Sequence, residues 1–395
     1  MSPPPRPIHV VDTTMFWSPT GGGVGRYLRT KHAWLGALPG WRHTIAVPAG
    51  ADAAPGLVRL PAVPIPGSGG YRLPLRRHAI ANRLGELEPD LIEAGDPYVV
   101  AWAAVDAARR RGIPAVAYCH SNLEAMARLA AGPRFGRFAA RAARAYARRV
   151  YRRFDRVLAP SASMRDQLLD WGIERVACQP LGVDSAAFDP SRASAAWRRE
   201  LGFDAASRVL VYAGRFAPEK HLDVLAAAVD RLGAPYTLVA IGAGPTPPRG
   251  DRVRVLPFVA GTEALATAFA SADAFVHAGD QETFGLSVLE AMACATPVVA
   301  RRAAGLAELV DDTVGIGVDA GHVGAFADAI AALFASDRAP RRAAARARAE
   351  AHDWNRVLPA LLGQYRELLQ AGSASIGGAR DGAFDAAAPA ALHPR

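Results

Sequence analysis

Short apolar stretches alternate along most of the chain with longer segments in which apolar residues recur every three to four positions. The short stretches are typical of buried strands, and the longer segments of amphipathic helices. In the first half the pattern predicts strands at 8–11, 43–47, 90–93, 114–120 and 156–161, and helices from about 24 and at 75–87, 99–111, 135–153 and 164–171. Such alternation favours a parallel sheet with helices on both faces, where ligands bind beyond the carboxyl ends of the strands.

The same alternation resumes after residue 205, with strands at 209–213, 236–241, 253–259, 273–277 and 297–300 and helices from 221 and at 263–270, 285–293 and 306–310. We therefore predict an α/β fold of two Rossmann-like, doubly wound parallel-sheet domains that face each other across a cleft. The predicted parts are a first domain at 1–185, a Pro-, Ser- and Ala-rich linker at 186–205, a second domain at 206–351, a closing helix at 352–370 that packs back toward the first domain, and a disordered tail at 371–395.

Length and composition narrow the class of protein. A chain of 395 residues that is 51% hydrophobic is expected to form two cores. No apolar run approaches the ~20 residues of a membrane span, and the start has no signal-peptide pattern, which predicts a cytoplasmic protein. Three widely spaced cysteines make disulfides and a zinc site unexpected. The net charge of +9 favours anionic partners, and since only Lys31 and Lys220 are lysines, each lysine is more informative than an arginine.

The stretch 273–299 combines a buried strand, a polar loop at 279–285 and a helix. Loop amides and the first N–H groups of the helix converge on one spot, which suits phosphate oxygens. Two acids, Glu282 and Glu290, are separated by seven intervening residues in this stretch. Eight residues of helix place two Cα atoms about 12 Å apart, well beyond the ~5 Å of a retaining glycosidase pair. The two acids are therefore better placed to bind two different hydroxyl groups of one long ligand than to act as a catalytic pair. The alternative is an ordinary helix whose acids are solvated.

Two cations follow the strand at 209–213. Arg215 and Lys220 stand just past its carboxyl end, at the start of the next helix. A planar guanidinium and a compact ammonium in that position suit a diphosphate, whereas a solvated loop is the other interpretation.

A glycine-rich loop and a histidine are the corresponding candidates in the first half. Gly21, Gly22, Gly23 and Gly25 open the helix from about residue 24, where they permit a close approach of an anion. A dinucleotide-binding fingerprint does not fit, because the glycines come ten residues after the strand and the next strand ends in proline rather than an acid. His120 stands at the end of another strand, where it is placed either to contact a ligand or to serve the structure alone.

A basic helix is predicted at 134–153, with Arg134, Arg137, Arg141, Arg144, Arg148 and Arg152 in one stripe. Such a helix can lie on an anionic bilayer. The alternative, which we favour, is a solvated arginine face above an apolar face that packs on the sheet.

These residues resemble retaining glycosyltransferases of family 4, which have the two-lobed GT-B fold. The resemblance extends to about residue 370 and is most specific in HAGDQETFGLSVLEAMACATPVV, which carries Glu282 and Glu290. It is reinforced, in the family order, by the first-lobe glycines and by the phrases APSASMRDQL, PLGVDSAAF, GRFAPEKHLD and IGAGP.

The resemblance implies a role for each matching residue. Arg215 and Lys220 would clamp the donor diphosphate, Glu282 would hold a sugar hydroxyl, and His120 would approach the transferred sugar. Glu290 would hold the ribose hydroxyls. The remaining donor-binding positions implied in this way are Gly22 and Gly23 near the diphosphate and the acceptor, Gly242 in IGAGP, Val259 beside the base, and the amides of Gly285, Leu286 and Ser287.

The family pattern further implies a hexosyl transfer, of glucose or mannose, from a UDP- or GDP-sugar to a saccharide or lipid acceptor. It implies no metal, no cofactor, no nucleic-acid partner and peripheral contact with the inner membrane face through 134–153. The sequence departs from the pattern at two positions where glycine is usual, Ala295 and Ala304. A nucleotide-sugar epimerase of the same architecture and a non-catalytic nucleotide-sugar binding protein are the competing hypotheses.

Overall fold

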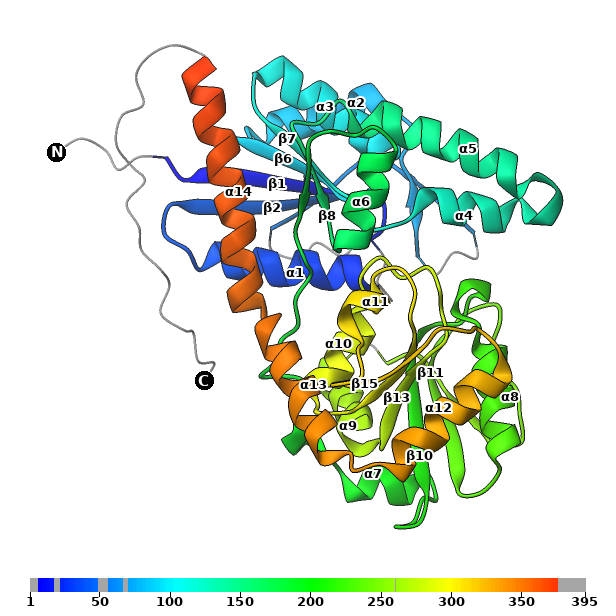
Figure 1. Cartoon of the computed structure of the whole chain (residues 1–395). Coiled ribbons are helices and arrows are strands. Elements are labelled where there is room, and N and C mark those ends of the chain that lie inside the picture. The colour runs from blue at the N-terminus through cyan, green and yellow to red at the C-terminus, as the bar shows by residue number, and fades with distance from the viewer. Residues whose placement is uncertain (1–5, 18–21, 49–55, 67–69, 260, 376–395) are drawn as a thin grey trace. The chain divides into compact units, whose positions relative to one another are not determined.

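The computed structural model describes residues 6–17, 22–48, 56–66, 70–259 and 261–375, so Gly21 and most of the predicted tail lie outside the described residues. The chain divides into two compact units. Unit 1 contains residues 1–160, 165–179 and 357 onward, and unit 2 contains residues 161–164 and 180–356. Figure 1 shows that each unit has its own sheet with helices packed against it.

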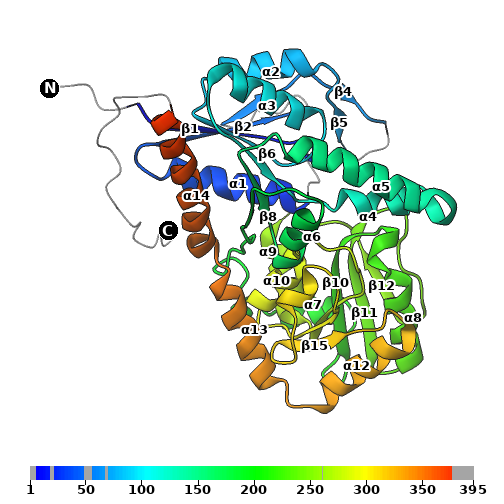
Figure 2. The ribbon, with the colours of Figure 1, turned by 45° about the horizontal axis from the view of Figure 1, so that its top comes forward.

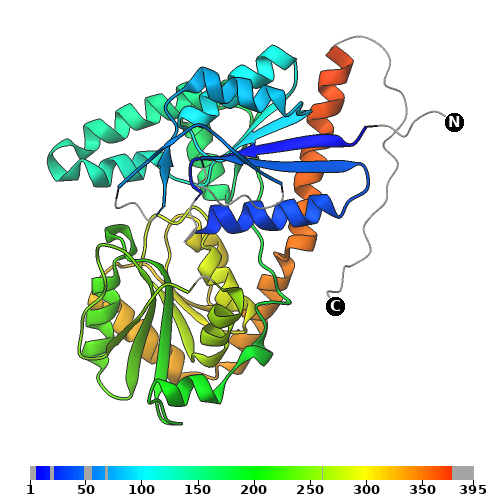
Figure 3. The same ribbon diagram turned by 180° about the vertical axis from the view of Figure 1, so that it is seen from behind.

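Unit 1 is built on a seven-stranded parallel sheet in the order β3-β2-β1-β6-β7-β8-β9. Figure 3 shows α1 on one face of this sheet and α2 and α3 on the other. The strands are β1 (Ile8–Thr13), β2 (Trp41–Val47), β3 (Leu57–Arg59), β6 (Leu91–Ala94), β7 (Ala115–Tyr118), β8 (Arg156–Ala159) and β9 (Val176–Cys178). The helices are α1 (Gly23–Gly36), α2 (Arg77–Glu86), α3 (Val99–Arg111), α4 (Leu123–Ala130), α5 (Gly132–Tyr151), α6 (Ala162–Asp170) and α14 (Trp354–Ser375), and β4 (Val63–Pro64) pairs with β5 (Arg72–Leu73).

Unit 2 is built on a six-stranded parallel sheet in the order β12-β11-β10-β13-β14-β15. Its strands are β10 (Arg208–Arg215), β11 (Tyr236–Ala243), β12 (Val253–Leu256), β13 (Ala274–His277), β14 (Val298–Arg301) and β15 (Gly315–Val318). Its helices are α7 (Ala195–Glu200), α8 (Leu222–Leu232), α9 (Thr262–Ser271), α10 (Leu286–Ala293), α11 (Leu306–Leu309), α12 (Val323–Ala335) and α13 (Ala339–Ala351), with the short 3₁₀ turns η1 (Pro190–Arg192) and η2 (Pro218–Lys220).

The strands of unit 2 are apolar at nearly every position because helices cover both faces of the sheet. On one face Leu225 of α8 and Phe326 of α12 join a buried cluster with Leu210 of β10. On the other face Phe269 of α9 packs edge-on against Phe275 of β13, with ring centroids 5.4 Å apart. This double cover holds the loops at the strand ends on a rigid base.

Both sheets reverse their strand order at one point. In unit 1 the reversal lies between β1 and β6, and in unit 2 it lies between β10 and β13. Loops that leave such a pair of strands at their carboxyl ends diverge and form a ligand-binding crevice. The prediction of two doubly wound parallel-sheet domains is confirmed.

The stretch 186–205, predicted as a linker, belongs to unit 2. It contains η1 and α7, and the side chain of Ser194 caps α7 by accepting from the N–H of Trp197. The N–H of Ser194 in turn donates to the hydroxyl of Ser271 in α9. Caps and tertiary hydrogen bonds of this kind fix a segment whose Pro, Ser and Ala content resembles that of a linker.

A buried charge cluster ties the C-terminal helix to the sheet of unit 1. Lys31 of α1 is fully buried, and its Nζ lies 2.9 Å from Asp12 Oδ1 of β1 and 3.1 Å from Glu93 Oε1 of β6. Tyr365 of α14 accepts from Lys31 at 2.5 Å and donates to Glu93 Oε2 at 2.5 Å. Buried charges need such partners, because an uncompensated one costs several kcal/mol. Helix α14 is thus held to unit 1 by hydrogen bonds to buried charged groups as well as by apolar packing.

The buried face of the basic helix α5 is apolar, as expected, but the two phenylalanines near its start are not part of it. The buried residues of α5 are Gly136, Ala140, Ala147, Val150 and Tyr151. Phe135 and Phe138 are instead 68% and 76% exposed. A Cβ at Gly136 would lie 2.6 Å from the backbone oxygen of Arg128, so α4 and α5 approach too closely for a larger side chain. Figure 2 shows the two helices projecting together from unit 1.

Candidate functional site

Polar residues gather beyond the carboxyl ends of β10 and β13, at the reversal point of unit 2. Lys220, on η2 after β10, forms an ion pair with Glu282, which stands in the loop after β13. The Nε2 atom of His277, the last residue of β13, lies 3.1 Å from the same carboxylate oxygen of Glu282. The sequence placed Lys220 and Glu282 in one site, and the structure brings their side chains together.

The Glu282 carboxylate is held as an anion. Burial alone would raise its pKa, but Lys220 and His277 outweigh burial and lower the pKa well below the usual range. His277 Nδ1 accepts from the N–H of Gly279 at 3.1 Å, so in the neutral ring the proton is on Nε2 and points at Glu282. His277 is 1% exposed and therefore fixes the orientation of the acid. Sequence reasoning missed this residue, although its place at the end of a buried strand was visible.

Arg215, the last residue of β10, stands at the same edge but is not drawn into the ion pair. Its side chain is 71% exposed, and its nearest carboxylate is Glu219, at 3.2 Å. Such a surface contact contributes little. The guanidinium is therefore free to turn toward an incoming anion.

Gly285 opens helix α10 from a left-handed conformation, with φ at +101°. A Cβ there would lie 2.5 Å from Leu306 Cδ2, so glycine is required both sterically and conformationally. The first intrahelical bond runs from Leu289 N to Gly285 O, and no side chain caps the helix. The amides of Leu286 and Ser287 consequently point out of the helix start, as anion binding requires.

Glu290 lies in the middle of α10 and is 2% exposed. The alternative of a helix whose second acid is simply solvated is therefore wrong for Glu290. A buried carboxylate in this position is shielded from water and suits a specific polar ligand or partner.

Gly305 packs closely against the loop that carries Glu282. Its N–H donates to the backbone oxygen of Glu282 at 2.9 Å, and a Cβ would lie 2.4 Å from the oxygen of Thr283. The contact explains why a glycine follows Ala304 in this sequence.

The two departures from the family pattern occupy left-handed backbone. Ala295, the residue after the C-cap of α10, has φ at +54°, and Ala304 has φ at +47°. Glycine adopts this conformation most easily, because a Cβ in it clashes with the neighbouring carbonyl oxygen at a cost of about 1–2 kcal/mol.

Ala295→Gly and Ala304→Gly should each stabilise unit 2 by about 0.5–1 kcal/mol, since glycine removes the clash but gives back part of the gain as unfolded-chain entropy. Urea unfolding followed by circular dichroism measures the effect. The matched change Ala291→Gly, inside α10, should destabilise instead by about 1 kcal/mol. Equal destabilisation by all three changes would show that the left-handed alanines are unstrained.

Gly242 and Val259 are the remaining sequence candidates in unit 2. Gly242 lies near the end of β11, where a Cβ would meet the backbone oxygen of Gly214 at 2.0 Å. Val259 lies beyond β12, which ends at Leu256 rather than at 259 as predicted, and it is partly exposed. Gly242 thus allows the exits of β10 and β11 to approach closely, and Val259 stands on an exit loop.

Unit 1 carries a second set of polar groups at its own reversal point. Asp96, which follows β6, accepts from the Thr14 hydroxyl at 2.9 Å and from the N–H groups of Met15 and Tyr98 at 2.6 and 3.0 Å. Burial raises the pKa of Asp96 to about 6 despite these donors. The loops that leave β1 and β6 are therefore tied together by one carboxylate, which sequence reasoning missed.

His120 follows β7 and stacks on Tyr118, with ring centroids 4.2 Å apart. Burial and the charge of Lys31 lower the pKa of His120 to about 3, so the ring is neutral near pH 7. Gly22 and Gly23 stand at the start of α1, and a Cβ on Gly22 would meet nothing within 4 Å. Among the described residues, nothing would obstruct a side chain at Gly22.

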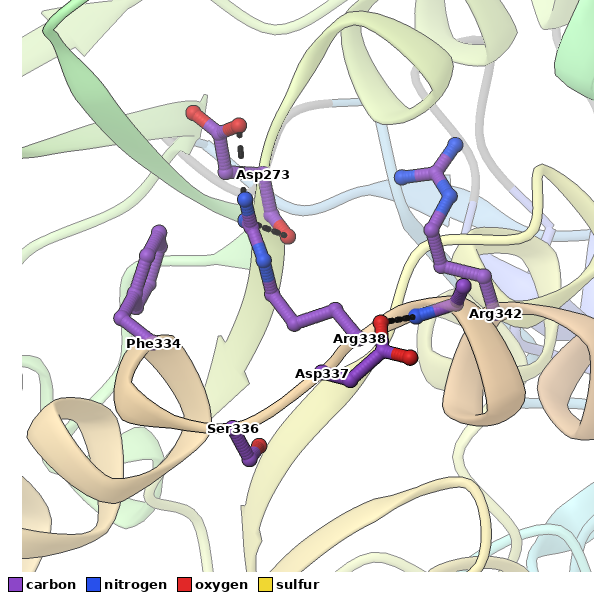
Figure 4. A pocket seen from close by; sticks show the side chains of 7 residues that line it. Asp273, Phe334, Ser336, Asp337, Arg338 and Arg342 are labelled. Carbon is purple, nitrogen blue, oxygen red and sulfur yellow. Dashed lines mark hydrogen bonds and ion pairs between the residues drawn. The ribbon is translucent and has the colours of Figure 1, made fainter.

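A shallow hollow in unit 2 lies away from these residues, at the amino end of β13 (Figure 4). Arg338 fills it, with its guanidinium 3.5 Å from Asp273 Oδ1 and 4.6 Å from the centre of the Phe334 ring. The contacts of Arg338 are structural, and the hollow contributes no residue to the candidate site. The described residues contain no group of three or more His, Cys, Asp or Glu side chains placed to hold a metal ion.

Comparisons with known proteins agree with this geometry. Residues 21–187 match the model of Glycosyltransferase Family 4, and residues 207–336 match that of Glycosyl transferases group 1. A GDP-mannose-dependent alpha-(1-6)-phosphatidylinositol dimannoside mannosyltransferase of Mycobacterium tuberculosis is 32% identical, with 90% of this chain and 95% of the relative covered. A GDP-mannose-dependent alpha-mannosyltransferase of Mycolicibacterium smegmatis is 35% identical over 79% of this chain and 82% of its own.

Solved structures share the fold. Sucrose-phosphate synthase from Thermosynechococcus elongatus superposes with a TM-score of 0.77 at 22% identity, covering 93% of this chain and 100% of its own. Anabaena HepE in complex with UDP and glucose gives a TM-score of 0.66 at 20% identity, covering 93% and 98%. With two doubly wound units, the matched models and a relative covered over nearly its full length, the chain belongs to glycosyltransferase family 4 and has the GT-B fold.

Proposed function

We propose that this glycosyltransferase moves a mannosyl group from GDP-mannose to a lipid or saccharide acceptor, with retention of the anomeric configuration and without a metal. The observation that carries the proposal is the pairing of Lys220 with Glu282 beside the open amides of α10. The two relatives described above are named for GDP-mannose, which favours that donor over a UDP-sugar.

The chemical task is to stabilise the departing diphosphate. The bond between the sugar C1 and the diphosphate oxygen breaks, the leaving group gains negative charge, and the acceptor oxygen bonds to C1 as it loses its proton. Lys220, Arg215 and the amides of Leu286 and Ser287 supply fixed positive charge and dipoles for the leaving group, which is the largest single contribution in such sites. In this proposal they take the place that a divalent ion would otherwise fill.

The acids take binding roles. Glu282 contacts Lys220 and His277 through Oε1, and we assign Oε2 to a hydroxyl of the transferred sugar. Glu290 takes the ribose hydroxyls, with Gly242 and Val259 near the nucleoside. His120, neutral near pH 7, contributes a hydrogen bond to the sugar rather than a charge.

A donor panel tests the proposal. Thermal shift and slow hydrolysis are measured with GDP-mannose, GDP-glucose, UDP-glucose and UDP-mannose, with and without EDTA. GDP-mannose should give the largest shift and should release GDP and α-mannose in EDTA. Formation of an epimerised nucleotide sugar without release of GDP would instead identify an epimerase, and binding without any turnover would identify a binding protein.

A lipid acceptor places the reaction at a membrane surface, and we assign that contact to residues 134–153. Helix α5 carries six arginines and no acidic residue, and Phe135 and Phe138 stand exposed beside them. Met126 and Leu129 of α4, each 43% exposed, extend the apolar surface. Cations around protruding aromatics suit an anionic bilayer. No helix in the described part of the chain combines the length and apolarity needed to span a membrane.

Vesicle flotation measures this contact. The protein should float with vesicles that contain anionic phosphatidylglycerol at low salt, and Phe135→Ser/Phe138→Ser should reduce the bound fraction about tenfold or more, because each phenylalanine contributes roughly 1.5–3 kcal/mol on burial. The matched change Val255→Ser, at an exposed apolar residue of unit 2, should leave flotation unchanged. Flotation that is insensitive to the two phenylalanines would place the contact elsewhere.

A further inference from the structure

We propose that unit 1 has a second anion site, formed by Arg77, Trp102, Arg149 and Arg153, that binds a phosphate group of the acceptor. The inference rests on the proposed function in taking the acceptor to be a phosphorylated lipid or saccharide. It adds a site that lies outside the donor machinery, although Arg149 and Arg153 belong to the basic segment 134–153.

Three guanidinium groups converge on one indole ring. The central carbons of Arg77, Arg149 and Arg153 lie 4.9, 5.7 and 5.1 Å from the centre of the Trp102 ring. The indole Nε1 donates to the hydroxyl of Tyr146 at 3.2 Å, which fixes the ring. Cation–π attraction thereby holds three like charges close together, although each repels the others.

The charge of this cluster is only partly balanced. Arg77 makes a two-pronged bond to Asp106, with both N–O distances at 2.6 Å. For Arg149 and Arg153 the described part of the chain offers no carboxylate within ion-pair distance, and the two residues are one helical turn apart. A phosphate between the two guanidinium groups would relieve their repulsion and accept several hydrogen bonds, which planar guanidinium forks provide well.

The position of the cluster fits an acceptor. Trp102 is in the first turn of α3, directly after the loop in which Asp96 accepts from the N–H of Tyr98. This loop leaves β6 at the reversal point of the unit 1 sheet, where ligands of such folds bind. A phosphate at Trp102 would therefore leave the rest of an acceptor within reach of that crevice.

The cluster also lies on the same face of α5 as the exposed aromatics. Arg149 follows Phe135 by 14 residues in α5, which is close to a whole number of turns at 3.6 residues per turn. A bilayer that contacts Phe135 and Phe138 would thus present its headgroup phosphates to Trp102, so the geometry favours a phospholipid headgroup over a free phosphate ester.

The test compares Arg149→Gln/Arg153→Gln with Arg109→Gln/Arg110→Gln, which removes the same charge from exposed positions at the far end of α3. Binding of soluble inositol phosphate is measured by calorimetry, and mannosyl transfer from GDP-mannose is measured with vesicles of phosphatidylinositol in phosphatidylcholine. We expect the first variant to weaken inositol phosphate binding and to raise the acceptor KM, each at least tenfold. The control should change either quantity less than twofold, and GDP-mannose binding should be unchanged in both.

Each other outcome has a definite meaning. An equal loss of inositol phosphate binding in the two variants would mean that general surface charge causes the effect. No loss in either variant would mean that the cluster binds no phosphate. Both results overturn the proposal. A loss for soluble inositol phosphate alone supports the site and identifies a free phosphate ester as its ligand. Failure of the wild type to bind GDP-mannose would contradict the proposed donor while leaving the soluble phosphate result valid.

Discussion

Lys220→Ala should lower kcat with GDP-mannose about 10²- to 10³-fold, the loss typical of removing one fixed electrostatic group at a developing anion. Lys220 is the side chain at the reversal point of unit 2 that is at once cationic, 11% exposed and fixed by a carboxylate. Arg215, at 71% exposure, is less well positioned to replace it. Turnover should fall more than donor affinity, because the diphosphate gains its charge only as the sugar departs.

Two further variants distinguish the charge of Lys220 from the roles of the residues around it. Glu290→Ala should mainly weaken donor binding, since the ribose hydroxyls carry the same charge before and during the reaction. His277→Phe should leave Lys220 in place but free Glu282 to rotate, and so lower kcat less than Lys220→Ala does. Steady-state kinetics and GDP binding by calorimetry measure the three effects. Wild-type kcat in Lys220→Ala together with wild-type affinity in Glu290→Ala would refute the assignment of this site.

The sequence places Lys220 and Glu282 of the candidate site together because each stands close to the end of its own strand. Lys220 follows its strand by a few residues, and Glu282 and Glu290 lie in one loop and helix. Strands β10 and β13 can be recognised in the sequence as apolar runs, because helices cover both faces of a parallel sheet. Once these strands are placed, their loops must leave at the same edge, so the pairing of Lys220 with Glu282 follows from topology.

Other features depend on contacts that spacing does not encode. The packed face of α5 is decided by Gly136 and its approach to α4, so the larger Phe135 and Phe138 are left exposed against the expectation from hydrophobicity. The guanidinium cluster on Trp102 joins three separate helical segments. Lys31 and Tyr365 meet although 334 positions separate them. Tertiary packing fixes these sites, and a single sequence carries no local signal for them.

Lys31→Met should destabilise unit 1 by about 3–5 kcal/mol, because it leaves the carboxylates of Asp12 and Glu93 buried without their cation. Asp12 and Glu93 are each 1% exposed, so water cannot replace the ammonium group. Burial would raise the pKa of Asp12, yet Lys31 and His43 bring it below the ordinary value, whereas burial dominates for Glu93 and raises its pKa. The lysine thus stabilises an anion at Asp12 in particular.

The loss should depend on pH in a predictable direction. Without Lys31, burial sets the pKa of Asp12 in the folded state above its pKa in the unfolded state. Between these two pKa values the folded state binds more protons than the unfolded state, so the variant loses stability as the pH rises. The difference from the wild type should therefore be larger at pH 8 than at pH 5 in urea unfolding. Lys31→Met/Asp12→Asn should recover a large part of the loss, since it removes the anion along with the cation. A deficit that is independent of pH and unrelieved by the second change would mean that Lys31 acts through packing of its chain against Tyr27 and Tyr365 rather than through its charge.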